Sequence, residues 1–313
     1  MNGHSATALP MTWRIDVSDR VKLMLAFVAI YVVWGSTYLA IRFAVEVLPP
    51  LFTAGTRHLI AGSVLLMWAR LSGRRATAAE WRASVIIGAL FFLLGHGTLH
   101  WAERTVPSAV ASLLYATEPI WIAGLLGLMT TKARMTWSMA GGLVLGLMGV
   151  GLLVWPDLTS TSGTSLMGTL AVLASAAAWA LGVVYSRRVS LPADPTLRAG
   201  TTLLSGAALL FIVATLAGEP GQLQAVTLTW KAIASLAYLV VFGSLIAYTS
   251  YMWLLERCSP TLVATHTYVN PLVAVFLGWL IGDEMLSLRV LGATALILLA
   301  VLLVGAETPK QRA

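Results

Sequence analysis

The chain has 313 residues, of which 58% are hydrophobic and 11% are charged, and its mean hydropathy is +0.84. Soluble globular proteins carry about 25% charged residues and somewhat under half apolar ones, so this composition excludes an ordinary soluble protein and indicates an integral membrane protein. The net charge of +7 comes from basic residues in the short breaks between apolar runs, a pattern typical of membrane anchoring and not of nucleic-acid binding.

Ten apolar segments are predicted to cross the membrane. A spanning helix needs about 20 mostly apolar residues, because about 30 Å of hydrocarbon is covered at about 1.5 Å per residue. Residues 1–22 are polar and lack the cleavage signature of a signal peptide, so the first apolar run is interpreted as a retained helix. The predicted spans of the first half are Leu23–Val45, Pro50–Arg70, Trp81–Leu99, Pro107–Met129 and Met135–Trp155. Those of the second half are Leu166–Arg187, Thr196–Ala217, Trp230–Trp253, Pro260–Ile281 and Leu288–Gly305.

The predicted loops on one side of the membrane are much more basic than those on the other. Fifteen Lys and Arg residues fall on the side of the N-terminus, whereas four fall on the opposite side and Arg57 lies inside a span. By the positive-inside rule, this asymmetry predicts a multi-pass protein of a cell membrane, in a bacterium the inner membrane, with both termini in the cytoplasm. The four basic residues on the predicted outer side are Arg42, Arg104, Lys231 and Arg289.

The two halves of the chain repeat each other. An offset of 145 residues places Trp34 on Trp179, and an offset of 152 places Glu118 on Asn270, each followed by a proline. Each half contains five predicted spans, an odd number, so the second half must enter the membrane from the opposite side. Such inverted repeats in secondary transporters place the substrate site near the membrane midplane, between the halves. The predicted division is a cytoplasmic segment 1–22, a first repeat 23–155, a periplasmic linker 156–165, a second repeat 166–305 and a cytoplasmic tail 306–313.

Several short motifs occur in the order found in a known family. They are Trp34-Gly35-Ser36-Thr37-Tyr38, Ala54-Gly55 followed by Arg57, Phe242-Gly243-Ser244, Tyr268-Val269-Asn270-Pro271 and Gly282-Asp283-Glu284. With ten spans and the repeat, the chain resembles the EamA family of the drug/metabolite transporter superfamily, particularly its YedA-like branch, from about Leu23 to Gly305. The resemblance implies a ten-helix carrier of a small metabolite, often moved outward. One departure is that the acidic residue after the fourth span is Glu284 in the second half but Lys132 in the first, which argues against a matched pair of carboxylates there.

Two polar residues are predicted to lie near the membrane midplane. Glu118 is eleven residues past Pro107, about 16 Å deep at the rise of a helix, and a charged group at that depth costs about 2.5 to 3.5 kcal/mol to insert. It is interpreted either as a site for a substrate ammonium group or a proton, or as a structural carboxyl that joins two helices. Asn270, at the same place in the repeat, is either a second ligand or a hydrogen-bonded anchor between helices.

Arg57 and three aromatic residues complete the centre of the predicted substrate site. Arg57 lies seven residues into the second span, so its guanidinium group either binds a carboxylate or phosphate, or reaches out to the interface or to Glu118. Trp34 and Tyr38 are four residues apart on one helix face, and Tyr115 precedes Glu118 by three residues. These aromatic side chains are candidates for substrate contact, with helix packing as the alternative.

Three histidines fall near these positions. His96 and His100 share a helix face with Glu103, a spacing that can hold a metal, but no third ligand is evident at matching depth, so no metal site is predicted. Both histidines are expected to face water, because His100 is close to the predicted outer interface. His266 precedes Asn270 by one helical turn and points either into the cavity or to a helix contact.

These features together predict an all-α integral membrane protein that works as a secondary transporter by alternating access, with an amino acid or a similar zwitterion as its substrate. A multidrug or cationic-compound exporter is the alternative within this class. An intramembrane metalloenzyme and a non-transporting scaffold or sensor are the alternatives outside it. The sequence contains no nucleotide-binding loop, and neither enzymatic activity nor a cofactor is predicted. The predicted partners are a small-molecule substrate and membrane lipid, with no nucleic acid, and a homodimer is left open.

The predicted orientation gives opposite results for two reporter fusions. Alkaline phosphatase, which is active only outside the cytoplasm, should be active when fused after Asp157 and silent when fused after Arg75. The reason is that the loop around Arg75 is basic, whereas the linker around Asp157 contains no Lys or Arg. Activity after Arg75 together with silence after Asp157 would reverse the orientation.

Overall fold

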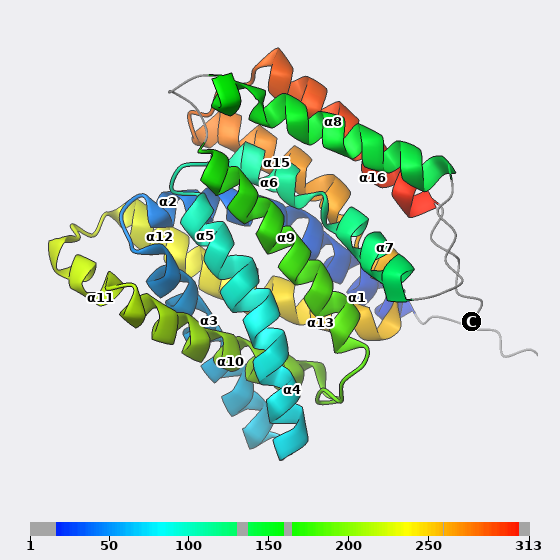
Figure 1. Ribbon diagram of the computed structural model, residues 1–313. Coiled ribbons are helices and arrows are strands. Elements are labelled where there is room, and N and C mark those ends of the chain that lie inside the picture. The colour runs from blue at the N-terminus through cyan, green and yellow to red at the C-terminus, as the bar shows by residue number, and fades with distance from the viewer. Residues whose placement is uncertain (1–16, 130–136, 160–164, 259, 307–313) are drawn as a thin grey trace, which may run out of the picture.

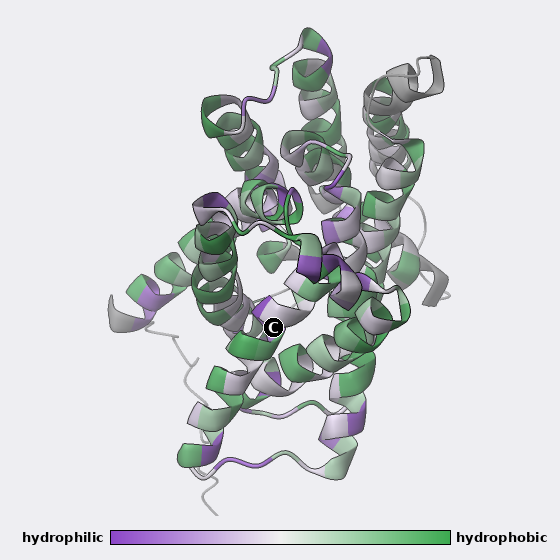
Figure 2. Ribbon diagram, turned by 90° about the vertical axis from the view of Figure 1, so that its left-hand side faces the viewer, coloured by the Kyte–Doolittle hydropathy of each residue, from purple (hydrophilic) through white to green (hydrophobic). Residues whose placement is uncertain are grey.

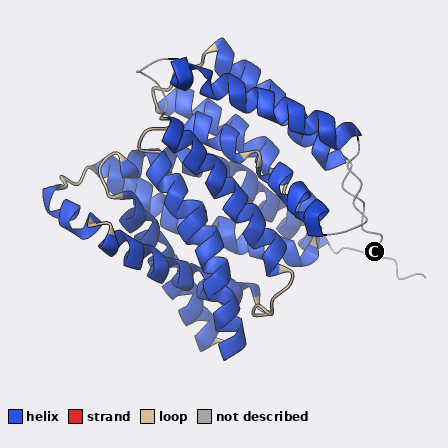
Figure 3. Cartoon of the chain, in the orientation of Figure 1, coloured by secondary structure: helices blue, strands red, loops and turns tan. Residues whose placement is uncertain are grey.

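Every regular element in the described residues is helical. The computed structural model describes residues 17–129, 137–159, 165–258 and 260–306, and it contains no strand within these ranges (Figure 3). Lys132 lies outside the described residues. The prediction of an all-α chain is confirmed for the part that the structure describes.

Helical segments occupy each of the predicted ranges. Those of the first half are α1 (Val17–Val28), η1 (Ala29–Val33), α2 (Trp34–Val45), α3 (Pro50–Leu71), α4 (Ala78–Gly88), η2 (Ala89–Gly97), α5 (Thr98–Ala102), α6 (Ser108–Tyr115), α7 (Glu118–Met129) and α8 (Trp137–Thr159). Those of the second half are α9 (Leu166–Ser186), α10 (Pro195–Leu216), α11 (Glu219–Gln222), η3 (Leu223–Ala225), α12 (Trp230–Tyr238), η4 (Leu239–Tyr248), α13 (Thr249–Arg257), α14 (Pro260–Val263), α15 (His266–Ile281) and α16 (Leu288–Ala306). Segments η1, η2 and η4 are π-helical and continue directly from one α-helix into the next, whereas η3 is a 3₁₀ turn.

Among the described residues, five helices are long and apolar enough to cross a membrane, judged by length and composition. They are Asp19–Val45, Ala78–Ala102, Leu166–Ser186, Pro195–Leu216 and Trp230–Arg257. Shorter apolar helices include His266–Ile281 and Leu288–Ala300. Figure 2 shows hydrophobic residues along most of the helices and many of the hydrophilic ones at helix ends and connecting loops. These features agree with a membrane protein, and ten crossings stay a prediction.

The fourth predicted span of each half is broken into two helices. The helix leaves its regular path at residues 116–117, between α6 and α7, and at residues 264–265, between α14 and α15. Pro119 then occupies the first turn of α7, where a missing backbone N–H costs nothing. The single helices expected over Pro107–Met129 and Pro260–Ile281 are therefore wrong, because each range contains a break.

Helices that correspond in the sequence repeat pack against each other. α3 and α10 lie side by side, and α8 and α16 form a second pair at one edge of the molecule (Figure 1). Glycines let α3 and α10 approach closely. A Cβ atom built on Gly62 would lie 2.9 Å from the backbone nitrogen of Leu204, and one on Gly200 would lie 2.8 Å from that of Leu66. The contact between the halves thus depends on residues without side chains.

Two glutamates cap helices of the other half. Glu219, which follows α10, accepts hydrogen bonds from two backbone N–H groups at the start of α3, the shorter one from Phe52 at 2.7 Å. Glu284, which follows α15, accepts from two backbone N–H groups at the start of α6, the shorter one from Ser108 at 2.7 Å. A carboxylate at a helix N-terminus satisfies free N–H groups and complements the helix dipole. Each cap therefore joins a helix of the first half to the second half, between the second predicted spans for Glu219 and between the fourth for Glu284.

A methyl group at the contact of α3 and α10 should be costly. Gly200→Ala should destabilise the protein by about 1–3 kcal/mol, because the added carbon would meet the backbone of α3, which cannot move aside as a flexible side chain does. Gly151→Ala in α8 is the matched control, since nothing lies within 4 Å of the added carbon. Melting temperatures of the purified variants in detergent test this, and equal values for the two would show that the close contact at Gly200 does not exist.

Candidate substrate site

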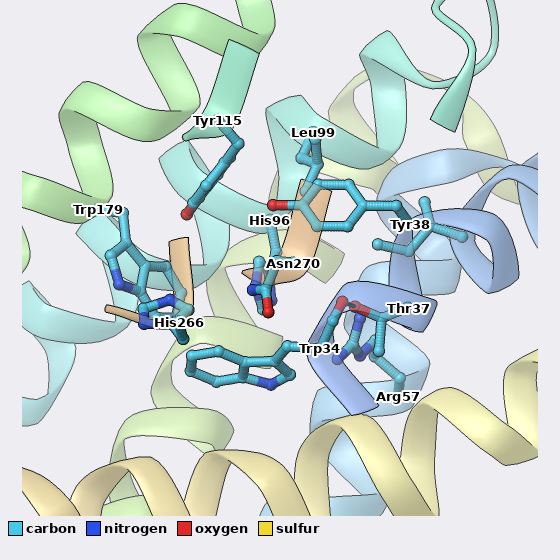
Figure 4. A pocket seen from close by; sticks show the side chains of 11 residues that line it. Trp34, Thr37, Tyr38, Arg57, His96, Leu99, Tyr115, Trp179, His266 and Asn270 are labelled. Atoms are coloured by element: carbon cyan, nitrogen blue, oxygen red, sulfur yellow. Dashed lines mark hydrogen bonds between the residues drawn. The ribbon is translucent and has the colours of Figure 1, made fainter. Parts of the chain in front are cut away.

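A small cavity lies where side chains from both halves converge. Its volume is about 30 Å³, enough for about two water molecules. Figure 4 shows Tyr38 and Tyr115 on one side of the cavity and Trp34 on the other. The residues that line it are Trp34, Thr37, Tyr38, Ile41, Arg57, His96, Leu99, Tyr115, Trp179, His266 and Asn270.

The cavity brings together most of the residues predicted to form the substrate site. Six of them line it: Trp34, Tyr38, Arg57, Tyr115, His266 and Asn270. The seventh, Glu118, does not line the cavity, although it is only 1% exposed and stands at the start of α7, just past the break. Sequence reasoning did not assign the other five lining residues to the site, which are Thr37, Ile41, His96, Leu99 and Trp179. Helical spacing from Trp34 reaches Thr37 and Ile41, and the repeat pairs Trp34 with Trp179, so both signals were present in the sequence.

Two tryptophans that correspond in the repeat meet at the centre of the molecule. The rings of Trp34 and Trp179 lie edge to face, with their centroids 5.8 Å apart. The Trp34 ring also contacts Tyr251 and His266, at centroid distances of 4.9 and 5.2 Å. These separations are typical of favourable aromatic pairs. The cavity therefore lies beside a contact between equivalent positions of the two halves.

Each of the three π-helical segments offers a carbonyl group to a side chain of another helix. A π-helix replaces the usual i to i+4 pattern, which leaves backbone acceptors free at the transition. Ser175 on α9 donates to the carbonyl oxygen of Gly95 in η2 at 2.8 Å. Trp34 Nε1 donates to the carbonyl oxygen of Gly243 in η4 at 3.1 Å. These bonds hold the first helix of each half against the third helix of the other half.

Asn270 provides the corresponding bond for η1. With the amide oriented to satisfy both of its ends, its nitrogen donates to the carbonyl oxygens of Tyr31 at 2.8 Å and Ile30 at 3.0 Å. Its repeat mate Glu118 begins α7, which packs against α9, and residues 174–178 of α9, at the place equivalent to η1, are α-helical throughout. Glu118 Oε2 is buried without a hydrogen-bond partner. Asn270 on α15 therefore binds its helix to η1, whereas one carboxyl oxygen of Glu118 is left without a hydrogen-bond donor.

Arg57 lies inside the bundle and not at its interface with lipid. Its side chain is 1% exposed, and its Nε donates to Ser244 Oγ at 3.1 Å. Of the alternatives for Arg57, a side chain that reaches the membrane interface is excluded, because η4 closes over it. A Cβ atom built on Gly243 would lie only 2.9 Å from Arg57 Nη2. Nη1 has no hydrogen-bond partner, and among the described residues no ion pair joins Arg57 to Glu118.

The histidines are turned toward the protein interior. His96 lines the cavity and stacks on Trp179 at a centroid distance of 5.1 Å. The expectation that His100 faces water is wrong, because this residue is fully buried, with Nδ1 2.6 Å from the carbonyl oxygen of His96. His58, which the sequence did not single out, places Nε2 3.1 Å from His96 Nδ1. Within the described ranges, no group of three or more His, Cys, Asp or Glu side chains is arranged to hold a metal ion.

Known proteins are similar to this chain over nearly its whole length. The sequence model of the EamA-like transporter family matches residues 21–155 and 166–306. The chain is 35% identical over 288 residues to the uncharacterized inner membrane transporter YedA of Escherichia coli strain K12, covering 89% of each protein. It is 24% identical to the uncharacterized transporter YoaV of Bacillus subtilis, covering 88% of this chain and 94% of the relative. A solved crystal structure, 22% identical, shares the fold with a TM-score of 0.61 over 91% of this chain and 96% of that one.

Substitutions at the two repeat-related positions should have opposite effects on stability. Asn270→Asp should lower the free energy of unfolding by about 1–3 kcal/mol, because a carboxylate would face two carbonyl oxygens to which the amide now donates. Glu118→Gln, the matched control, should leave stability unchanged or higher, because an unpartnered amide costs less to bury than an unpartnered carboxylate. Both are measured by thermal melting of the purified protein. Parental melting of Asn270→Asp would exclude the anchoring role.

Proposed function

The chain belongs to the EamA-like transporter family, and we propose that it is a secondary transporter that exports or exchanges a small zwitterion, such as an amino acid, across a bacterial inner membrane. Relatives that are named transporters support the general class. The substrate and the mechanism are inferred from the central cavity and its surroundings. The proposed mechanism is alternating access between two inverted five-helix halves, with recognition and release as its only chemistry.

The observation that carries the proposal is that one buried basic group and one buried acidic group each leave a polar atom without a partner. Arg57 Nη1 and Glu118 Oε2 are both buried, neither has a hydrogen-bond partner, and among the described residues they do not pair with each other. An isolated buried charge costs several kcal/mol, so such groups favour a ligand that supplies the missing partner. A zwitterion carries a carboxylate for the guanidinium group, which binds carboxylates in bidentate geometry, and an ammonium group for the carboxyl.

The aromatic side chains that line the cavity favour an organic substrate, and they also suggest a second candidate for the substrate class. Trp34, Trp179 and Tyr115 present ring surfaces to the cavity, which suit an apolar side chain. The faces of such rings also attract organic cations, so an exporter of cationic compounds is the second candidate. Arg57 lines the same cavity and would repel a purely cationic substrate, which favours the zwitterion.

Substrate entry requires the cavity to expand. Sites for small organic ligands have volumes of about 300–1,000 Å³, whereas this cavity has about 30 Å³. In the proposed cycle the halves separate first on one side and then on the other, and the contact between Trp34 and Trp179 parts as the cavity widens toward Glu118. The sequence contains no nucleotide-binding loop, so the proposed driving force is a concentration gradient of substrate or of a coupled ion.

The test compares one substrate with two analogues that each lack one charge. A thermal-shift screen of the twenty amino acids selects the compound that raises the melting temperature most, since a ligand of the folded state stabilises it. Proteoliposomes are then assayed for uptake of this amino acid, of the amine that lacks its carboxylate, and of the 2-hydroxy acid that lacks its ammonium group. The parent should prefer the amino acid by about tenfold or more, equivalent to about 1.4 kcal/mol for one lost charge partner.

Two variants test which side chain binds which charged group of the substrate. Arg57→Gln should reduce the preference for the amino acid over the amine, and Glu118→Gln should reduce the preference over the 2-hydroxy acid. Gly151→Ala, which changes nothing near the cavity, is the control for handling and reconstitution. Equal uptake of amine and amino acid by the parent would favour the cation exporter, and unchanged preferences in both variants would contradict the proposed site.

A further inference from the structure

Glu103 is a second buried carboxyl group without a partner. It follows α5 and is 0% exposed, and neither of its carboxyl oxygens has a hydrogen-bond partner. Its backbone N–H donates at 2.9 Å to Leu99, which lines the central cavity. Two residues further along the chain, Thr105 lines a different cavity. Glu103 therefore lies between residues that line two separate cavities.

The second cavity is large and charged. Its volume is about 600 Å³, and it lies between the end of α2, the start of α6 and the loop that joins α15 to α16. Arg42, Glu46 and Arg289 are among the residues that line it. Arg42 and Arg289 belong to the side of the membrane that the charge asymmetry predicts to be external. This outer cavity reaches Thr105, two residues past Glu103, whereas Glu103 itself is not among the residues that line it.

Charged and titratable groups surround Glu103 without binding its carboxyl. Arg42 Nη1 donates at 3.0 Å to the backbone oxygen of Glu103 and not to its side chain. The other groups that act on it are Tyr38 on α2, Arg57 on α3 and Glu284 after α15. Burial raises the pKa of the Glu103 carboxyl well above its usual value, with the negative charge of Glu284 adding to the rise and the guanidinium groups of Arg42 and Arg57 opposing it.

A row of imidazole groups continues from Glu103 to the central cavity. His100 precedes Glu103 by three residues, which is about one helical turn and places both residues on the same helix face. Its Nδ1 bonds the carbonyl oxygen of His96 at 2.6 Å and must carry the hydrogen, so Nε2 has a free lone pair, and that atom is buried without a partner. His96 lines the central cavity and bonds His58 at 3.1 Å. Arg57 is a charged group that faces this row from α3.

The residue that corresponds to Glu103 in the second half has a different environment. Glu256, at an offset of 153, pairs with Arg198 at 2.8 Å, and its side chain is 23% exposed. A carboxylate that is paired and partly hydrated stays charged at modest cost, whereas one that is sealed without a partner is stable as the neutral acid. If the acid served only to hold the structure together, it would need an ion-pair partner at both repeat-related positions, Glu103 and Glu256. The difference points to a proton on Glu103.

We propose that Glu103, His100, His96 and His58 bind protons and carry them between the outer cavity and the central cavity, and that this movement is coupled to transport, a coupling that rests on the proposed function. The Glu103 carboxylate takes a proton from a hydronium ion, which becomes water. No direct hydrogen bond joins the acid to the row, so the acid gives the proton to an intervening water molecule, which passes a proton to an imidazole nitrogen, and from there it reaches water or substrate in the central cavity. No electron is exchanged, and the central cavity releases the proton to the other side when it opens there.

The transport test compares Glu103→Gln with Glu256→Gln, the same change at the equivalent position. Proteoliposomes are assayed with a mixture of tritium-labelled amino acids, first as counterflow without a pH gradient and then with an imposed gradient. The parent and Glu256→Gln should be accelerated by the gradient. Glu103→Gln should keep counterflow and lose the acceleration. His100→Gln should do the same, and it replaces Glu103→Gln as the decisive variant if the latter does not fold.

A second measurement is independent of transport. Infrared spectra of the purified proteins across a pH series report the carbonyl band of protonated carboxyl groups. At neutral pH this band should be weaker in Glu103→Gln than in the parent, and unchanged in Glu256→Gln. Counterflow without any response of the parent to the gradient would overturn the proton coupling and leave the transporter intact. Absence of counterflow in every protein would contradict the proposed function, and the infrared difference would then decide the proton site alone, with identical bands overturning it.

Discussion

A hydrocarbon environment offers no hydrogen-bond partners, and this constraint governs how the helices are held together. Where a π-helical segment frees a carbonyl group, a side chain from another helix binds it, as Trp34 does for η4 and Asn270 for η1. Where a helix begins, a carboxylate from a neighbouring segment caps it, as Glu284 does for α6. Several buried polar atoms stay without a partner, and the ionisable groups among them are Arg57, Glu118, Glu103, His58 and His100.

The scaffold is repeated, but its chemistry is not. Trp34 and Trp179 occupy equivalent positions, and their rings are in contact edge to face. Two other pairs diverge. Asn270 is a donor that finds carbonyl groups in η1, whereas Glu118 is an acid facing a regular helix. Glu256 is ion-paired and partly exposed, whereas Glu103 is sealed and alone. The two halves therefore share their helix packing but differ in the charged and polar groups placed at equivalent positions.

Hydropathy and the repeat predict much of this arrangement, because apolar run length is set by the bilayer and equivalent residues return at a fixed offset. They do not predict which way a polar side chain turns. The depth of Arg57 in its helix is compatible with a side chain that extends to the membrane interface or with one that points to the centre of the bundle. The rotation of α3 relative to η4 determines which of the two directions it takes. His100 presents the same ambiguity, since a helix end near the interface still has an inner face. The break before Glu118 is followed closely by Pro119, whereas no proline stands beside the break at residues 264–265.

Gly243 is a position where a substitution would move the guanidinium group of Arg57 without changing its charge. The carbonyl group of this residue holds Trp34, and the space where a side chain would stand is filled by the guanidinium group of Arg57 and the methyl of Thr37, at 2.9 and 3.0 Å from a Cβ built there. One added carbon would displace the guanidinium along the cavity while its charge stayed the same. A side chain at position 243 is therefore incompatible with the present place of the guanidinium group, so this glycine fixes where the positive charge of Arg57 stands.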